Sequence, residues 1–215
     1  MTANPSDSAL LPVVPQRAPS PQPASPSLSL SPSPASTLEP APAPAPAPVP
    51  AVSAEPTLTQ LLARATRLAA EPGLIERLAT EPDQRTWLPL DAGPGTRAWL
   101  IAWPPGTGTG WHDHGGACGA MVALAGELTE RSIEVPADHV YGQAIALPGG
   151  VGSVRPLRAE NGRAFGGRHI HEVVNEGTQI AYSVHVYAPD LDLMRHYAVS
   201  GESLVLVGME TDRDW

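Results

Sequence analysis

The fold of this chain is decided by one stretch, WHDHGGACGAMVALAG at residues 111–126. His112 and His114 stand two residues apart. Because alternate residues of a strand share a face, both imidazoles are expected to point the same way and Asp113 to point away. Two inward-facing imidazoles at a strand end form half of a metal site. The apolar run that follows predicts another strand, with a hairpin over residues 122–128 that turns at Gly126.

Short apolar or alternating runs continue outward from this stretch, separated by glycine and proline. They lie at residues 98–103, 121–125, 128–135, 141–147, 151–157, 170–174, 180–187 and 204–207. Many short strands at this spacing, with turn residues between them, are typical of a β-sandwich or a β-barrel. The sequence therefore predicts an all-β dominated domain, a barrel of roughly eight to ten strands.

The segment before the strands predicts short N-terminal helices. Thr57 and Gln60 are spaced as in a capping box, and apolar residues then recur at helical spacing. Pro72-Gly73 breaks this pattern, and a second short helix is expected over residues 74–79. The folded domain is expected to span residues 57–215, with its helices at residues 57–81.

Residues 1–56 differ from the rest of the chain in composition. They hold 16 of the 26 prolines, four charged side chains and no aromatic residue. Such a stretch cannot bury enough apolar surface to offset the entropy lost on ordering. We predict a disordered tail rich in Pro, Ala and Ser.

The composition excludes several classes of function. All 13 basic residues are arginine, which rules out Schiff-base chemistry and a phosphate-binding loop that ends in lysine. A net charge of −9 without basic clusters makes nucleic acid and anionic membranes poor partners. No apolar run reaches the ~18 residues of a membrane helix. The lone cysteine, Cys118, excludes a disulfide framework, and we expect a soluble, cytoplasmic monomer.

All seven histidines lie between residues 112 and 196, and His169 and His171 repeat the spacing of the first pair. Either one could supply a third metal ligand. Period two places Ser183, His185 and Tyr187 on one strand face, with valines on the other. Buried polar groups need partners, so we expect a hydrogen-bonded relay that presents the phenol of Tyr187 to the barrel interior.

Together these patterns resemble the cupin superfamily. Residues 106–126 are similar to the first cupin motif, and His171 with Asn175 is similar to the end of the second. Cys118 and Gly119 stand where cupins usually carry a glutamate, so the expected site has three histidines and no carboxylate. A three-histidine cupin followed by Ser-x-His-x-Tyr resembles the cysteine dioxygenase family of thiol dioxygenases, over residues 57–200. The resemblance implies a double-stranded β-helix, a jelly-roll-like barrel.

The resemblance also implies roles for individual residues. The implied ligands of one Fe(II) per chain are His112, His114 and His171. The implied catalytic residues are Tyr187 with its hydrogen-bonding support, His185 and Ser183. His169 is expected to be dispensable. Animal members carry at Gly119 a cysteine that is cross-linked to the tyrosine, so the chain resembles the bacterial members without that cross-link, and Cys118 is expected to be a buried structural thiol.

The implied reaction is the oxidation of a small thiol by O2, most simply of L-cysteine to cysteine sulfinate. For the arginine that binds the substrate carboxylate in this family, Arg85 is the nearest candidate. Thr86 or Pro89 could occupy the aligned position instead, and a neutral residue there favours 3-mercaptopropionate. Two other readings stay open. One is a different metal-dependent cupin, which does not need the relay, and the other is a cupin binding module without turnover.

Overall fold

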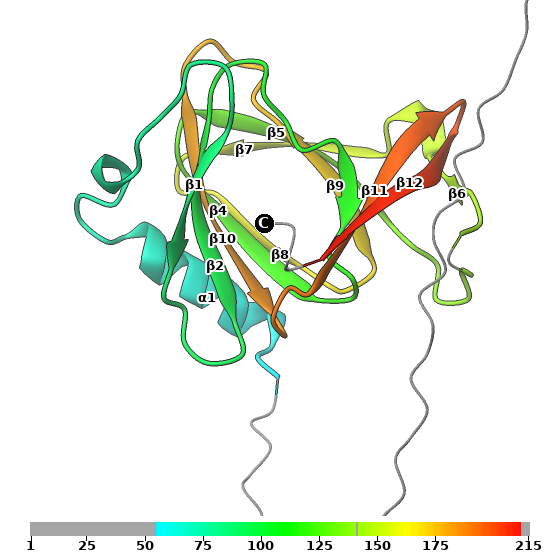
Figure 1. Ribbon diagram of the computed structural model, residues 1–215, viewed down its shortest axis with the longest axis horizontal. Helices are drawn as coiled ribbons and strands as arrows, with labels where there is room; N and C mark the ends of the chain where they lie inside the picture. Colours follow the sequence, from blue (N-terminus) through cyan, green and yellow to red (C-terminus); the bar gives the residue numbers. More distant parts are fainter. Residues whose placement is uncertain (1–54, 141, 212–215) are drawn as a thin grey trace, which may run out of the picture. The chain divides into compact units, whose positions relative to one another are not determined.

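The protein is described by a computed structural model that covers residues 55–140 and 142–211 (Figure 1). The predicted disordered tail lies outside the described residues, apart from its last two. The described chain forms one α-helix, two 3-10 turns and two antiparallel sheets. None of its helices combines the length and the apolar character that a membrane crossing requires.

The helix α1 (Leu58–Ala69) begins where the capping box predicted. The Thr57 hydroxyl accepts the Gln60 backbone N–H at 3.3 Å, and the Gln60 side chain accepts the Thr57 backbone N–H at 2.8 Å. The face that α1 buries consists of Leu61, Ala65 and Leu68. The second predicted helix is reduced to one 3-10 turn, η1 (Ile75–Arg77).

The described residues form twelve strands. In chain order they are β1 Thr86–Leu90, β2 Arg97–Trp103, β3 Trp111–Asp113, β4 Cys118–Ala125, β5 Glu127–Glu134, β6 Ile145–Ala146, β7 Ser153–Arg158, β8 Gly162–Phe165, β9 His169–Val174, β10 Ala181–Ala188, β11 Leu193–Ser200 and β12 Ser203–Thr211. A second 3-10 turn, η2 (Pro148–Gly150), follows β6.

The strands form a five-stranded sheet in the order β1-β2-β10-β4-β8 and a seven-stranded sheet in the order β6-β12-β11-β3-β9-β5-β7. Figure 1 shows the two sheets curling around a common core, with α1 packed outside β4, β8 and β10. The expected all-β dominated barrel preceded by a short helix is therefore confirmed. The strand number exceeds the prediction because short strands such as β8 carry little hydrophobic periodicity of their own.

Strand β10 shows how period-two alternation builds two cores. Val184 and Val186 pack with α1 in a cluster outside the five-stranded sheet. Tyr187 points the other way, into the core between the sheets, together with Trp103 and Phe165. The predicted separation of polar and valine faces along this strand is confirmed.

Two predicted elements are wrong. The chain does not form a hairpin at Gly126, because β4 belongs to the five-stranded sheet and β5 to the seven-stranded sheet. Gly126 has a φ of +69°, and the chain crosses there from one sheet to the other. A Cβ at this position would lie 2.8 Å from the Cα of Ala181, so the crossing needs glycine. The strand predicted over residues 141–147 is limited, among the described residues, to Ile145–Ala146.

Candidate functional site

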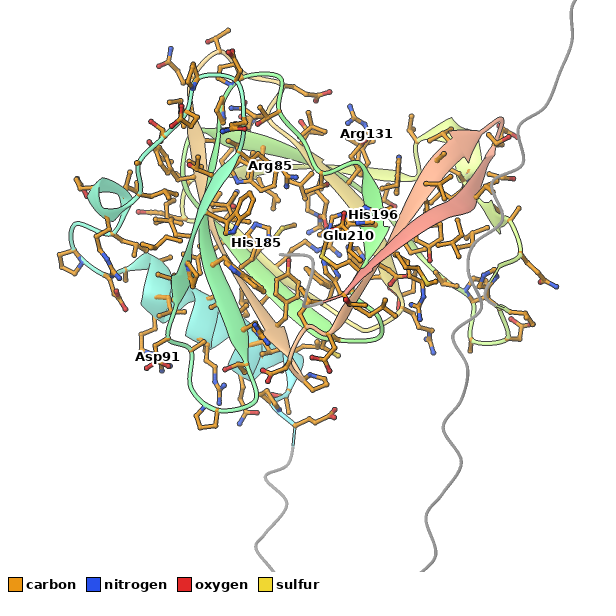
Figure 2. The ribbon with its side chains drawn as sticks, viewed as in Figure 1. Arg85, Asp91, Arg131, His185, His196 and Glu210 are labelled. Atoms are coloured by element: carbon orange, nitrogen blue, oxygen red, sulfur yellow. The ribbon has the colours of Figure 1, made fainter. Side chains whose placement is uncertain are left out.

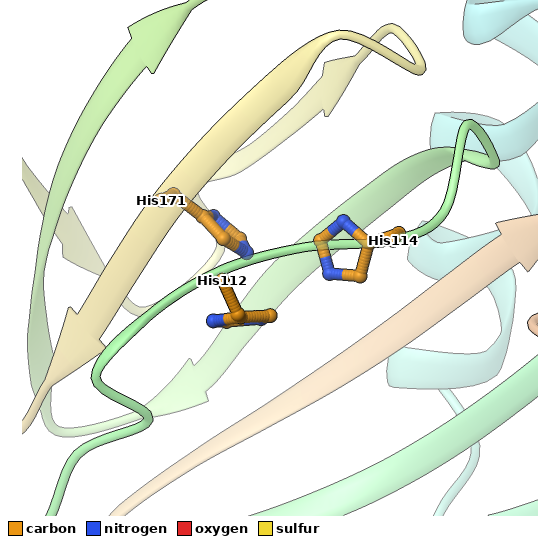
Figure 3. A group of neighbouring side chains, drawn as sticks. All are labelled: His112, His114 and His171. Atoms are coloured by element: carbon orange, nitrogen blue, oxygen red, sulfur yellow. The ribbon is translucent and has the colours of Figure 1, made fainter. Parts of the chain in front are cut away.

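Three histidines meet where β3 and β9 lie side by side in the seven-stranded sheet (Figure 3). His112 pairs directly with His171 across the two strands, and His114 follows the end of β3. The ring centroids are 4.7 Å apart for His112 and His171, 4.9 Å for His112 and His114, and 5.1 Å for His114 and His171. All three side chains are buried. The structure thus brings together the three histidines that the sequence singled out.

The hydrogen bonds of two of these rings determine which of their nitrogens keeps its lone pair. His112 Nδ1 lies 3.1 Å from the carbonyl oxygen of Gly110, and His171 Nδ1 lies 2.9 Å from Oε1 of Glu130. Both acceptors require a proton on Nδ1, which leaves Nε2 of each ring unprotonated. The Nε2 atoms of His114 and His171 are buried without a hydrogen-bond partner among the described residues.

The cluster fits a metal ion. One potential ligand atom from each ring lies within 4.8 Å of the others, and buried nitrogens without partners are the donors that a cation would satisfy. Burial holds the pKa of His112 and of His114 well below the usual value, and it also lowers the pKa of His171. The imidazoles are therefore neutral near pH 7, the state in which histidine binds metals.

His169, the partner of His171 in the second pair, has a different environment. Its Nε2 lies 3.0 Å from Oε1 of Glu130, and its side chain is buried. Glu130 also accepts a hydrogen bond from Arg163. Burial alone would raise the pKa of Glu130, but the hydrogen bonds from both histidines outweigh it and hold that pKa well below its usual range. Sequence reasoning missed Glu130 and Arg163.

The predicted relay is present on β10. Ser183 Oγ lies 2.8 Å from His185 Nε2, and His185 Nδ1 lies 3.1 Å from the Tyr187 hydroxyl. Trp103 extends the relay, because its indole N–H donates to Ser183 Oγ at 2.9 Å. Burial lowers the pKa of His185 to about 3 and raises the pKa of Tyr187. The Tyr187 ring lies beside His114, with the two centroids 4.6 Å apart, so the relay ends next to the histidine cluster.

A pocket of about 360 Å³ joins the relay to the cluster. Its walls include His112, His171, His185 and Tyr187, with several tryptophans and aliphatic side chains. Arg85, just before β1, lines the same pocket, whereas Thr86 and Pro89 are not among its lining residues. Figure 2 places Arg85, His185, His196 and Glu210 around the opening of the barrel.

Arg85 is the cationic group of this pocket. Its guanidinium carbon lies 5.2 Å from the ring centroid of Trp103, a cation–π distance. Burial lowers the pKa of Arg85, and the nearby Tyr187 and Glu210 partly offset this lowering. No carboxylate in the described part of the chain forms an ion pair with Arg85, although Glu210 lines the pocket and lies 3.4 Å from His196. Sequence reasoning missed Glu210, because no motif surrounds it.

Cys118 and Gly119 lie on opposite faces of β4. Cys118 is only half-buried, not buried as the sequence predicted, and it packs with the cluster beneath α1, away from Tyr187. A Cβ at Gly119 would collide with the ring of Phe165 and lie 3.1 Å from Cδ1 of Tyr187. The glycine therefore stands where a side chain would reach the tyrosine, and the sulfur of Cys118 lies on the other side of the sheet.

Comparisons with known proteins bear on this arrangement. A family model for cysteine dioxygenase type I matches residues 69–200. None of the curated proteins matches the chain. Among solved structures, TT1209 from Thermus thermophilus is 23% identical, with 54% of this chain and 93% of that one covered and a TM-score of 0.42.

Two further solved structures are similar at lower identity. A cupin superfamily protein from Desulfitobacterium hafniense DCB-2 is 13% identical, covering 56% of this chain and 93% of that one, with a TM-score of 0.43. The cupin domain of Cnp3 from Schizosaccharomyces pombe is 12% identical, covering 52% and 66%, with a TM-score of 0.39.

The family match extends over more than half of the chain, from within α1 to the end of β11. It includes the three clustered histidines, the relay on β10 and Arg85, whereas Glu210 lies beyond it. The chain therefore belongs to the cysteine dioxygenase type I family and is a cupin-type dioxygenase.

Proposed function

We propose that the protein is an Fe(II)-dependent thiol dioxygenase that oxidises L-cysteine to cysteine sulfinate with O2. The observation that carries this proposal is one pocket that holds three kinds of group: neutral imidazoles with free nitrogens, a relay that ends in a phenol, and an arginine. The proposed ligands are His112, His114 and His171. A free thiol in the chain is compatible with a reducing compartment, and we place the reaction in the cytoplasm.

The donor set supports iron. The three neutral imidazoles would hold Fe(II), and the bound ion would supply the chemistry by which O2 oxidises a thiol to a sulfinate. Two of the three imidazoles form hydrogen bonds through Nδ1, one with the Gly110 carbonyl and one with Glu130. The protein's part is to hold these rings and to position the thiol.

The relay on β10 supplies a directed hydrogen-bond donor. The indole of Trp103 can only donate, so Ser183 Oγ accepts from it, and in the proposed relay the Ser183 hydroxyl donates to His185 Nε2. His185 then donates from Nδ1 to the Tyr187 oxygen, and the phenol hydrogen remains free to enter the pocket. Burial raises the pKa of Tyr187, so the phenol keeps this hydrogen throughout the physiological range.

Arg85 supports a substrate with a carboxylate. A half-buried guanidinium that lacks an ion-pair partner in the described chain is a site for an anionic group, and Arg85 shares its pocket with the relay and the histidines. L-cysteine and 3-mercaptopropionate both carry a thiol and a carboxylate, whereas cysteamine carries only the thiol and an amine. We favour L-cysteine because Arg85, rather than a neutral residue, lines the pocket.

The test is oxygen uptake by the iron-loaded protein with L-cysteine, 3-mercaptopropionate and cysteamine in parallel, with mass spectrometry of the products. We expect the fastest uptake with L-cysteine and a product that has gained two oxygen atoms. Arg85→Gln should raise KM for L-cysteine by about 10–100-fold, because a charge-assisted hydrogen bond is lost, and it should leave KM for cysteamine unchanged. Arg155→Gln on the exposed strand β7 is the matched control. An iron-loaded protein that consumes no oxygen with any thiol refutes the proposal.

A further inference from the structure

Glu130 is a buried carboxylate that would touch neither the substrate nor the metal in the proposed reaction. It lies on β5 between Leu128 and Ser132, on the face that looks into the barrel, and its side chain has no solvent exposure. A carboxylate in such a place is costly unless its oxygens accept several hydrogen bonds. Glu130 has three such donors, and this set of partners allows it to remain ionised in the core.

The donors divide between the two carboxylate oxygens. Oε1 accepts from His171 Nδ1 at 2.9 Å and from His169 Nε2 at 3.0 Å, while Oε2 accepts from Arg163. An ionised carboxylate can only accept, and each ring nitrogen that faces it must therefore carry a hydrogen. In His171 this hydrogen occupies Nδ1, which leaves the lone pair on Nε2.

We propose that Glu130 is a positioning residue that sets the tautomer and the orientation of His171, so that its Nε2 lone pair faces the cluster formed with His112 and His114. The inference rests on the metal site of the proposed function. It is supported by the free Nε2 of His171, which is buried without a hydrogen-bond partner among the described residues. Carboxylates that orient a metal-binding histidine from its other nitrogen commonly affect metal affinity about 10–100-fold.

The same carboxylate explains why His169 has a different task. Its Nε2 is occupied by Glu130, so that nitrogen has no lone pair to offer a metal. Glu130, His169 and His171 also lie close enough to suggest a second metal site. The guanidinium of Arg163, which donates to Glu130, would repel a cation at this position. The distances from Glu130 Oε1 to His171 Nδ1, 2.9 Å, and to His169 Nε2, 3.0 Å, are those of ordinary hydrogen bonds and need no bridging metal.

The first test reads the tautomer directly. Long-range ¹H–¹⁵N correlation spectra of the metal-free full-length protein, with His171 assigned through His171→Gln, should show its hydrogen on Nδ1. A hydrogen on Nε2 overturns the proposal without any change at Glu130. This result does not depend on thiol oxidation, so it separates a failure of the proposal from a failure of the proposed function.

The second test is Glu130→Gln, which keeps the shape and removes one acceptor. The amide cannot accept from both the histidine pair and Arg163, and where its NH2 faces His171 it drives the hydrogen onto Nε2. We expect the affinity for Co(II), measured by competition with a chelator, to fall about 10–100-fold, with an altered His171 tautomer. Glu172→Gln is the matched control, because Glu172 lies on β9 and pairs with Arg131 on the outer face. The Co(II) affinity of Glu172→Gln should be unchanged.

Glu130→Asp retains the carboxylate on a shorter side chain and should restore part of the affinity lost in Glu130→Gln. A Glu130→Gln protein with unchanged Co(II) affinity and the wild-type tautomer overturns the proposal. Binding of two Co(II) ions per chain, one of which disappears in His169→Ala, also overturns it in favour of a second metal site.

Discussion

Strand β9, and strand β3 with the residue that follows it, carry the same short pattern, a histidine on each side of one residue, yet the two pairs are used differently. In the pair His112 and His114 both imidazoles join the cluster, and Asp113 between them turns outward to Arg195 and Tyr197. On β9 both imidazoles also face inward, but only His171 joins the cluster. The two-residue spacing determines which face of the strand carries the imidazoles. The neighbouring strand determines their role, because β5 presents Glu130 to the two histidines of β9. Among the described residues, no equivalent carboxylate faces the rings of His112 and His114.

The largest expected effect separates the two histidines of β9. His171→Ala should abolish binding of one Fe(II), because it removes a nitrogen of the cluster. His169→Ala should retain the metal, because its Nε2 faces Glu130 instead. Metal content after dialysis measures both. Loss of iron from His169→Ala with retention in His171→Ala would reverse the assignment of the third ligand.

The next effect concerns the phenol on β10. Tyr187→Phe should keep the fold and the iron, with a stability cost of about 1 kcal/mol for one lost hydrogen bond. Turnover of the best thiol should fall at least about tenfold, because a preorganised donor beside the cluster is lost. Tyr182→Phe is the matched control, since Tyr182 lies on the same strand but does not line the pocket. Equal turnover by wild type and Tyr187→Phe would favour a cupin that does not need the relay.

A smaller effect should appear in the stability of the metal-free protein as the pH falls. Burial lowers the pKa of His185 from its usual 6.5 to about 3, and it lowers the pKa of the three clustered histidines as well. Below pH 6.5 the unfolded chain binds protons that the folded chain does not. The stability present above that pH is therefore lost as the pH falls towards the folded-state pKa, by at most about 1.4 kcal/mol per unit for each histidine.

Urea unfolding at pH 7.5 and 5.5 measures this loss. His185→Asn should be less stable at both pH values but should show a smaller difference between them. If the metal-free wild type had the same urea midpoint at both pH values, the buried histidine rings would be protonated in the folded state. That result would contradict the neutral imidazoles that both histidine pairs are argued to supply.

The smallest effect is expected from removing residues before Ala54. The site residues and α1 with its capping box all lie after this point. Iron binding and turnover should change by less than about twofold, which is within the effect of a surface change. A shortened protein that is insoluble or inactive would show that the tail packs on the domain.

Sequence periodicity predicted the features that depend on one strand at a time. The facing of His112 and His114, the alternation along β10 and the start of α1 are all local consequences of backbone geometry. Glu130 and Arg163 were missed because their role comes from contacts of β5 with β9 and from the pairing of β8 with β4, which periodicity does not encode. One signal was available: Glu130 occupies the inward position two residues after Leu128, where a charge is unusual.

The error at Gly126 has a related cause. Apolar residues on both sides of a glycine indicate a reversal of the chain, but they do not say whether the second strand pairs with the first or joins another sheet. Here the reversal carries the chain between sheets, and β4 therefore pairs with β8 and β10 instead of with β5.

The contact between Gly119 and Phe165 has a consequence for introducing a cross-link at this site. A cysteine at residue 119 would point at Tyr187 but would first meet the Phe165 ring, which also stacks on His114 and His169 with centroids 5.3 and 4.7 Å away. A cysteine introduced at residue 119 would therefore need the Phe165 ring to shift, and that shift would loosen the packing of two imidazoles. Phe165 thus couples the space beside the Tyr187 phenol to the positions of His114 and His169.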